Sequence, residues 1–261
     1  MACAGGAAHA VAVLRRWGGR RGPCPKVPRA KTLQQLSNEH IAALIATAAA
    51  AGLSVWAARR HPGPWVVPVS RGLAILILVA YVAEQVANAL RGTWTLGFNL
   101  PLQLTDAVTL VSILALWSPR PLLVELVYFW ALTASLQAVL TPDLGQAFPS
   151  IFYFTYFTTH SGAIVAACLL VFGRRLLPRL WAVWRIFALT VAFAVLAEAG
   201  NLLTGGNYMF LQEKPSRASV LDLMGPWPWY ILSAAALALA MFLTLEALAR
   251  ALRGSGTGWR V

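Results

Sequence analysis

Acidic residues are scarce in this chain, which has nine Asp and Glu against 21 Lys and Arg in 261 residues. Charged residues of both signs make up only 11% of the sequence, whereas a soluble globular domain carries about 25%. Cysteine is scarce too: there are three, without a CxxC pair or any other metal-ligand spacing. The composition argues against a soluble domain, and we predict no metal site and no cofactor.

Long apolar runs take the place of the missing charge. The sequence is 59% hydrophobic, and a helix needs roughly 20 mostly apolar residues to cross a bilayer. The runs lack the alternating pattern of an outer-membrane barrel. We therefore predict an all-α polytopic membrane protein, a bundle of about seven transmembrane helices within residues 37–252. The candidate segments lie at about 40–58, 68–90, 97–117, 121–141, 150–173, 178–203 and 227–250.

Basic residues are concentrated before the first apolar run. Seven of the 21 fall in the first 31 positions, where there is no acid. We predict a basic, disordered N-terminal tail over residues 1–36, or a start codon assigned too far upstream, and a short C-terminal tail over 253–261. Beside a membrane, such a tail has anionic lipid as its partner rather than nucleic acid. A homo-oligomer is possible.

The basic residues outside the tail are unevenly shared between the two sets of loops. The positive-inside rule then predicts that the C-terminus lies in the cytoplasm and the N-terminus outside, although counting the tail nearly balances the two sides. One set of loops holds Arg59, Arg60, Arg120, Arg174, Arg175, Arg179, Arg250, Arg253 and Arg260, and the other holds Arg91, Lys214 and Arg217.

Several carboxylates lie inside the apolar segments, where each costs at least a few kcal/mol unless it faces a bundle interior or a wet cavity. Glu84, Asp106 and Glu198 are internal, so we expect them to line a functional site. Glu125 and Glu246 lie near segment ends, and we expect them to be ordinary interfacial residues.

The third segment carries the densest polar stretch, Asn99-Leu-Pro-Leu-Gln-Leu-Thr-Asp106. Pro101 is expected to kink its helix near the membrane surface. Thr105 shares a face with Thr109, and Asp106 points about 100° away from Thr105. The Thr105 hydroxyl also has a structural alternative, a hydrogen bond to the carbonyl four residues earlier.

The fifth segment contains a candidate general base, His160. Tyr153, Tyr156 and His160 fall on one helix face, and Gly162 allows a neighbouring helix to approach closely. His160 could remove a proton, with the tyrosines as hydrogen-bond donors. As substrate-binding candidates we select polar groups expected to face the interior or the headgroups: Glu84, Gln103, Tyr156, Glu198, Asn201 and Lys214.

Four motifs together resemble those of the bacterial YwaF-type integral membrane proteins, over residues 37–250. They are Leu100-Pro-Leu-Gln-Leu-Thr-Asp106, His160-Ser-Gly162, Asn207-Tyr-Met-Phe-Leu-Gln-Glu-Lys-Pro215 and Leu221-Asp-Leu-Met-Gly-Pro-Trp-Pro-Trp-Tyr230. The chain also distantly resembles a eukaryotic multipass ether-phospholipid acyltransferase and intramembrane threonine hydrolases. The resemblance implies a multipass protein of the bacterial plasma membrane, with a Thr105 nucleophile and a His160 base. The chain departs from many such relatives, in which a cysteine is expected at position 105 and a histidine at 103.

The leading hypothesis is a lipid acyltransferase or hydrolase with an intramembrane Thr105–His160 site, tuned by Asp106. A second is a proton- or cation-coupled carrier that uses the internal acids and His160. A third is a membrane scaffold in which the buried polar groups only hold the bundle together by interhelical hydrogen bonds.

Overall fold

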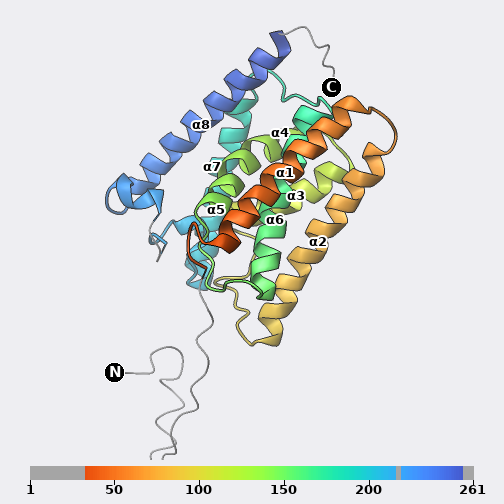
Figure 1. Ribbon diagram of the computed structural model, residues 1–261. Helices are drawn as coiled ribbons and strands as arrows, with labels where there is room; N and C mark the ends of the chain where they lie inside the picture. Colours follow the sequence, from red (N-terminus) through yellow and green to blue (C-terminus); the bar gives the residue numbers. More distant parts are fainter. Residues whose placement is uncertain (1–32, 216–218, 255–261) are drawn as a thin grey trace, which may run out of the picture. The chain divides into compact units, whose positions relative to one another are not determined.

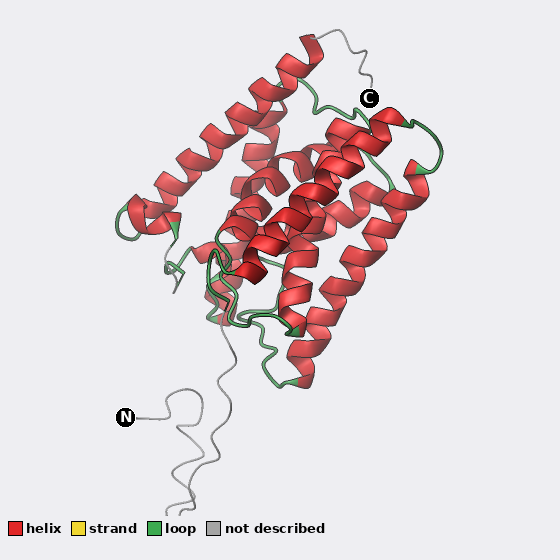
Figure 2. Ribbon diagram, in the orientation of Figure 1, coloured by secondary structure: helices red, strands yellow, loops and turns green. Residues whose placement is uncertain are grey.

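The computed structural model describes residues 33–215 and 219–254, and every regular element in these ranges is helical (Figures 1 and 2). Residues 1–32 and 255–261 lie outside the described ranges, and with them most of the two predicted tails. The elements are α1 (Asn38–Arg60), α2 (Val66–Leu90), α3 (Leu104–Trp117), α4 (Pro121–Trp130), η2 (Ala131–Ser135), α5 (Leu136–Leu140), α6 (Ile151–Ala167), η3 (Cys168–Gly173), α7 (Ala182–Thr204), η4 (Tyr208–Phe210), η5 (Val220–Met224) and α8 (Trp229–Gly254).

The predicted bundle of about seven helices is confirmed. Among the described residues, six helical spans are long and apolar enough to cross a membrane, and α3 is a shorter apolar helix. The π-helical turns η2 and η3 join their neighbours, so that 121–140 and 151–173 are each one continuous span. These two spans are the most buried ones, and they form the centre of the bundle.

Close packing of α2 against α6 depends on a glycine. A Cβ atom on Gly162 would lie 2.6 Å from Cγ1 of Ile77, a distance that real Cβ atoms do not reach. The prediction that Gly162 allows a neighbouring helix to approach is therefore confirmed. On the outside of the bundle, side chains such as Leu53, Val79 and Leu203 are exposed, as lipid-facing residues of a spanning helix should be.

The third helix begins at Leu104 and not at about residue 97, so the predicted kink at Pro101 is wrong. The preceding peptide groups have partners that a helix would not give them. Asn99 Oδ1 accepts from the backbone N–H of Thr95 at 2.9 Å. The Tyr208 hydroxyl accepts from the N–H of Leu100 at 2.9 Å and donates to the carbonyl of Leu96 at 2.6 Å. Pro101 therefore lies in a loop that leads into α3.

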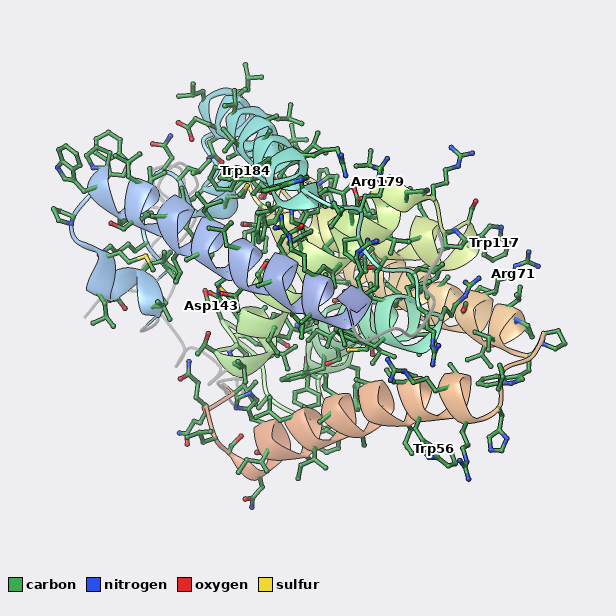
Figure 3. All side chains as sticks on the ribbon, turned by 90° about the horizontal axis from the view of Figure 1, so that it is seen from above. Trp56, Arg71, Trp117, Asp143, Arg179 and Trp184 are labelled. Carbon is green, nitrogen blue, oxygen red and sulfur yellow. The ribbon has the colours of Figure 1, made fainter. Side chains whose placement is uncertain are left out.

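Charge is divided between the two ends of the bundle. Successive spans alternate in direction (Figure 1), so the ends of α1, α3, η3 and α8 meet the starts of α2, α4 and α7. We call this end the arginine-rich end; it carries Arg59, Arg60, Arg71, Arg120, Arg174, Arg175, Arg179, Arg185, Arg250 and Arg253. The opposite half, the acidic half, carries Glu39, Glu84, Asp106, Asp143, Glu198, Glu213 and Asp222. In Figure 3, Arg71 and Arg179 lie away from Asp143.

Candidate functional site

Polar side chains of α2, α3 and α6 meet in the acidic half. Glu84 on α2 interacts electrostatically with Asp106 on α3, and Thr155 on α6 lies near the Glu84 carboxyl group. The three helices contact one another pairwise. The structure thus brings together two of the internal acids that the sequence singled out.

Thr105 and Asp106 occupy the first turn of α3. Gln103 precedes the helix with an extended backbone, and its carbonyl accepts from the N–H of Asp106 at 3.0 Å. A carboxylate in a first turn is favoured by the helix dipole. The carbonyl of Thr105 accepts from the Thr109 hydroxyl at 2.8 Å. The Thr105 hydroxyl itself makes no hydrogen bond to any described residue, so the alternative bond to Pro101 is not formed.

His160 is held through one ring nitrogen. Its Nδ1 lies 2.8 Å from the carbonyl oxygen of Tyr156 and 3.2 Å from Oγ1 of Thr159, and its ring stacks on the Tyr156 ring at 4.2 Å between centroids. A carbonyl oxygen only accepts, so Nδ1 carries the proton and Nε2 has a free lone pair. Within the described ranges, no hydrogen bond joins His160 to Thr105 or engages Nε2.

The tyrosines on the same face tie α6 to its neighbours. Tyr156 donates its hydroxyl hydrogen to the carbonyl of Ala138 on α5 at 2.8 Å. Tyr153 donates to the carbonyl of Glu39 on α1 at 2.7 Å. The predicted donors are therefore present, but they bond backbone carbonyls. Tyr156 also orients His160 by stacking against it.

Asn201 fastens the loop after α7 to the helix that precedes it. Its Oδ1 accepts from the N–H of Tyr208 at 2.5 Å, and its Nδ2 donates to the Tyr208 carbonyl and to Glu198 Oε2, both at 3.1 Å. Gln212 from the same loop donates its side-chain amide to Glu198. Tyr208 is fully buried, and burial raises the pKa of its phenol.

Gln103 and Lys214 also contact this loop region. Gln103 Oε1 accepts from the N–H of Met209 at 2.8 Å, and Met209 has a left-handed backbone with φ of 56°. Lys214 places its ammonium 5.4 Å from the centroid of the Tyr230 ring. Asn201, Glu198, Gln103 and Lys214 thus lie in or beside the loop that follows α7, and their assignment to substrate binding stays a prediction.

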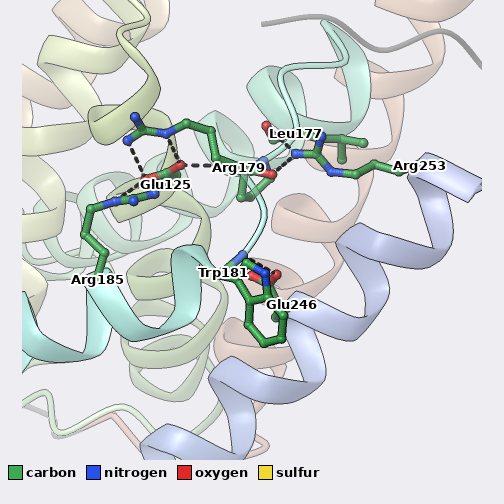
Figure 4. Close-up of polar contacts among 8 residues, drawn as sticks. Glu125, Leu177, Arg179, Trp181, Arg185, Glu246 and Arg253 are labelled. Atoms are coloured by element: carbon green, nitrogen blue, oxygen red, sulfur yellow. Dashed lines mark hydrogen bonds and ion pairs between the residues drawn. The ribbon is translucent and has the colours of Figure 1, made fainter.

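A buried carboxylate at the arginine-rich end was not expected. Glu125 is only 1% exposed and accepts from Arg179 Nε at 2.8 Å and Arg185 Nη2 at 2.7 Å (Figure 4). The expectation of an ordinary interfacial residue is therefore wrong: because Glu125 lacks solvent, it is stabilised by two guanidinium groups instead. Its hydrogen bond raises the pKa of Arg179. No local pattern in the sequence could indicate partners that lie 54 and 60 positions away.

Glu246 is not an ordinary interfacial residue either. It is 4% exposed and accepts from the backbone N–H of Trp181 and from Nε of Arg250, each at 3.0 Å (Figure 4 shows Trp181 beside it). The Arg250 partner lies one helical turn away, which is a signal that the sequence did contain. Both carboxylates at this end are therefore structural ion-pair partners.

The described residues contain no group of three or more His, Cys, Asp or Glu side chains that could hold a metal ion. No curated protein and no solved structure matches this chain. A family model described as the TMEM164 family matches residues 35–246, which include Thr105, His160 and most of the helical bundle. The chain therefore belongs to the TMEM164 family of multipass membrane proteins.

Proposed function

We propose that this protein is a membrane acyl-ester enzyme, a transferase or a hydrolase, with Thr105 as nucleophile and His160 as general base. The hydrogen bonding and ring stacking of His160 give this proposal its main support. Its Nδ1 is fixed by the Tyr156 carbonyl and its ring by the Tyr156 ring, so that Nε2 is left as a proton acceptor. The resemblance to acyltransferases and threonine hydrolases supplies the chemical class.

The depth of the two residues in the bundle supports their pairing. At a rise of about 1.5 Å per residue, Thr105 lies about 18 Å of helix from the end of α3, and His160 about 20 Å from the end of η3. Both ends are at the arginine-rich side, and α3 contacts α6. General-base contacts often tighten only when substrate binds. We infer that an ester entering from the lipid brings the Thr105 hydroxyl and His160 Nε2 together.

The proposed reaction has two steps. Thr105 Oγ attacks the acyl carbonyl carbon while its proton moves to His160 Nε2, and the leaving alcohol takes that proton as its bond to the acyl carbon breaks. Water, or the hydroxyl of a second lipid, then attacks the acyl-threonine and gives its proton to His160 Nε2. The bond between the acyl carbon and Thr105 Oγ breaks, and Thr105 Oγ takes that proton back. The first acceptor gives a hydrolase and the second a transferase. Asp106, adjacent to Thr105 in the first turn of α3, is proposed to tune or orient the site.

Labelling with a fluorophosphonate probe tests the nucleophile. The wild type is expected to label, and Thr105→Ala is expected to lose the label because no hydroxyl remains. Thr244→Ala is the matched control, since its hydroxyl is exposed on α8 and bonds only its own helix. Equal labelling of wild type and Thr105→Ala would remove Thr105 from the mechanism.

The interaction between Glu84 and Asp106 favours a second candidate, a proton- or cation-coupled carrier. Two carboxylates close together in a bundle interior favour a shared proton or a bound cation. Proteoliposomes under an imposed pH gradient would then take up protons in the wild type but not in Glu84→Gln. Glu198→Gln is a weaker test than the sequence implied, because Glu198 holds Asn201 and Gln212. Proton flux with unlabelled Thr105 would favour the carrier over the enzyme.

A further inference from the structure

We propose that Arg179 and Arg185 form a binding site for the phosphate of an anionic phospholipid headgroup, at the arginine-rich end of the bundle. The site is independent of Thr105 and His160, which belong to other helices. Arg179 lies in the segment between η3 and α7, and Arg185 lies in the first turn of α7. Both side chains converge on Glu125 of α4 (Figure 4).

The charges around Glu125 do not cancel. One carboxylate faces two guanidinium groups, which leaves one positive charge at the edge of the membrane. Within residues 33–215 and 219–254, neither arginine pairs with any other carboxylate, and the neighbouring Glu246 is paired with Arg250. A single arginine would have sufficed to neutralise Glu125. The excess positive charge is therefore available to attract an anion from outside the protein.

The arginines are also held in a geometry that suits phosphate. Arg179 uses Nε and Nη2 on Glu125, at 2.8 and 3.1 Å, and Arg185 uses the same two atoms, at 3.1 and 2.7 Å. The Nη1 group of each guanidinium remains unused by the described residues. The side chains are 49% and 39% exposed, so these donors reach the surface. Donors fixed in advance lose little entropy when they bind a planar or tetrahedral oxyanion.

The surroundings favour a lipid over a free phosphate ion. Trp181 and Trp184 both precede Arg185 at the start of α7, and they are 60% and 51% exposed (Figure 3 labels Trp184 and Arg179). Exposed tryptophans at a helix end are typical of the headgroup level of a membrane. A phosphate held by the arginines would thus have its glycerol and acyl ester beside indole rings. Basic pockets between transmembrane helices bind anionic headgroups in the same way.

Thermal unfolding of the full-length protein in neutral detergent tests the site. Short-chain phosphatidylglycerol is expected to raise the midpoint of unfolding more than short-chain phosphatidylcholine does, because the latter's own cation offsets its phosphate. In Arg185→Gln the apparent dissociation constant for phosphatidylglycerol should rise about fivefold or more. Arg179 still pairs with Glu125 in that variant, so the fold is retained.

The controls distinguish specific binding at Arg179 and Arg185 from nonspecific attraction of lipid to surface charge. Arg120→Gln removes an equal charge from an exposed position at the same end, and its affinity for phosphatidylglycerol should match the wild type. If Arg120→Gln weakens binding as much as Arg185→Gln, the proposal is wrong. It is also wrong if inorganic phosphate at equal concentration gives the full shift. Arg179→Gln provides a second variant, and the difference between the two lipids within each protein does not depend on its basal stability.

Discussion

His40 on α1 and His160 on α6 differ in how many of their ring nitrogens form hydrogen bonds. His40 accepts from the N–H of Leu36 through Nδ1 at 2.9 Å, and its Nε2 donates to the carbonyl of Val139 at 2.8 Å. Both nitrogens are engaged, and the side chain is fully buried. His160 engages only Nδ1. Individual hydrogen bonds therefore assign His40 a structural role and leave His160 able to accept a proton.

This difference predicts opposite phenotypes. His40→Ala should lower the free energy of unfolding by about 1–3 kcal/mol, because it leaves buried hydrogen-bond partners unsatisfied. His160→Gln should abolish fluorophosphonate labelling while changing stability much less. Parallel measurement of the unfolding midpoint and of labelling in both variants checks the assignment. Loss of labelling in a fully folded His40→Ala protein would contradict it.

Glu125 allows a second prediction at the scale of one residue. Glu125→Gln removes the negative charge that holds Arg179 and Arg185, and stability should fall by about 1–3 kcal/mol. The loss stays moderate because both guanidinium groups are partly exposed and regain water. Glu213→Gln, at an exposed position in the acidic half, is the control and should leave the unfolding midpoint unchanged. Equal midpoints for Glu125→Gln and wild type would show that the ion pairs stabilise nothing.

At the scale of elements, the start of α3 is set by the loop that follows α7. Gly97 and Gly206 bring the two backbones together, and a Cβ atom on Gly206 would lie 2.4 Å from the carbonyl oxygen of Gly97. Tyr208 and Gln103 add the hydrogen bonds between them. The motif 207–215 thus has a structural task at the entrance to the proposed site.

Gly206→Ala should force these two loops apart. We expect a loss of stability of about 1–3 kcal/mol, and weaker labelling of Thr105 because the first turn of α3 loses its support. Gly145→Ala is the matched control, since nothing lies within 4 Å of a Cβ atom there. Unfolding midpoints of the two variants give the comparison. A Gly206→Ala protein as stable as Gly145→Ala would mean that the loops do not support α3.

The sequence predicted the spans well because hydropathy and length act locally within each helix. It did not predict where α3 begins, since Tyr208 bonds Leu100 from 108 positions away. It failed on Glu125 for the same reason. In contrast, the close approach at Gly162 was predictable, because a glycine on a helix of large side chains signals contact directly. Thr105 and His160 could be nominated from their residue types, but their separation depends on how α3 packs against α6.

At the scale of the whole molecule, the division of charge implies an orientation. Ten arginines at one end should face the cytoplasm under the positive-inside rule, and the acidic half should face outward. In a background with Cys3 and Cys24 replaced by serine, a membrane-impermeant maleimide should label Gly145→Cys on intact cells but not Ser118→Cys. The reverse pattern would invert the orientation.

A covalent acyl intermediate at Thr105 is the central step of the proposed mechanism. The purified protein would be incubated with an activated fatty-acyl ester, quenched in acid and digested, and the acyl mass would be located by peptide mass spectrometry. We predict the acyl group on the peptide that carries Thr105, and its absence from Thr105→Val. An acyl group on a different residue, or none at all in a folded protein that turns over the ester, would contradict the proposed mechanism.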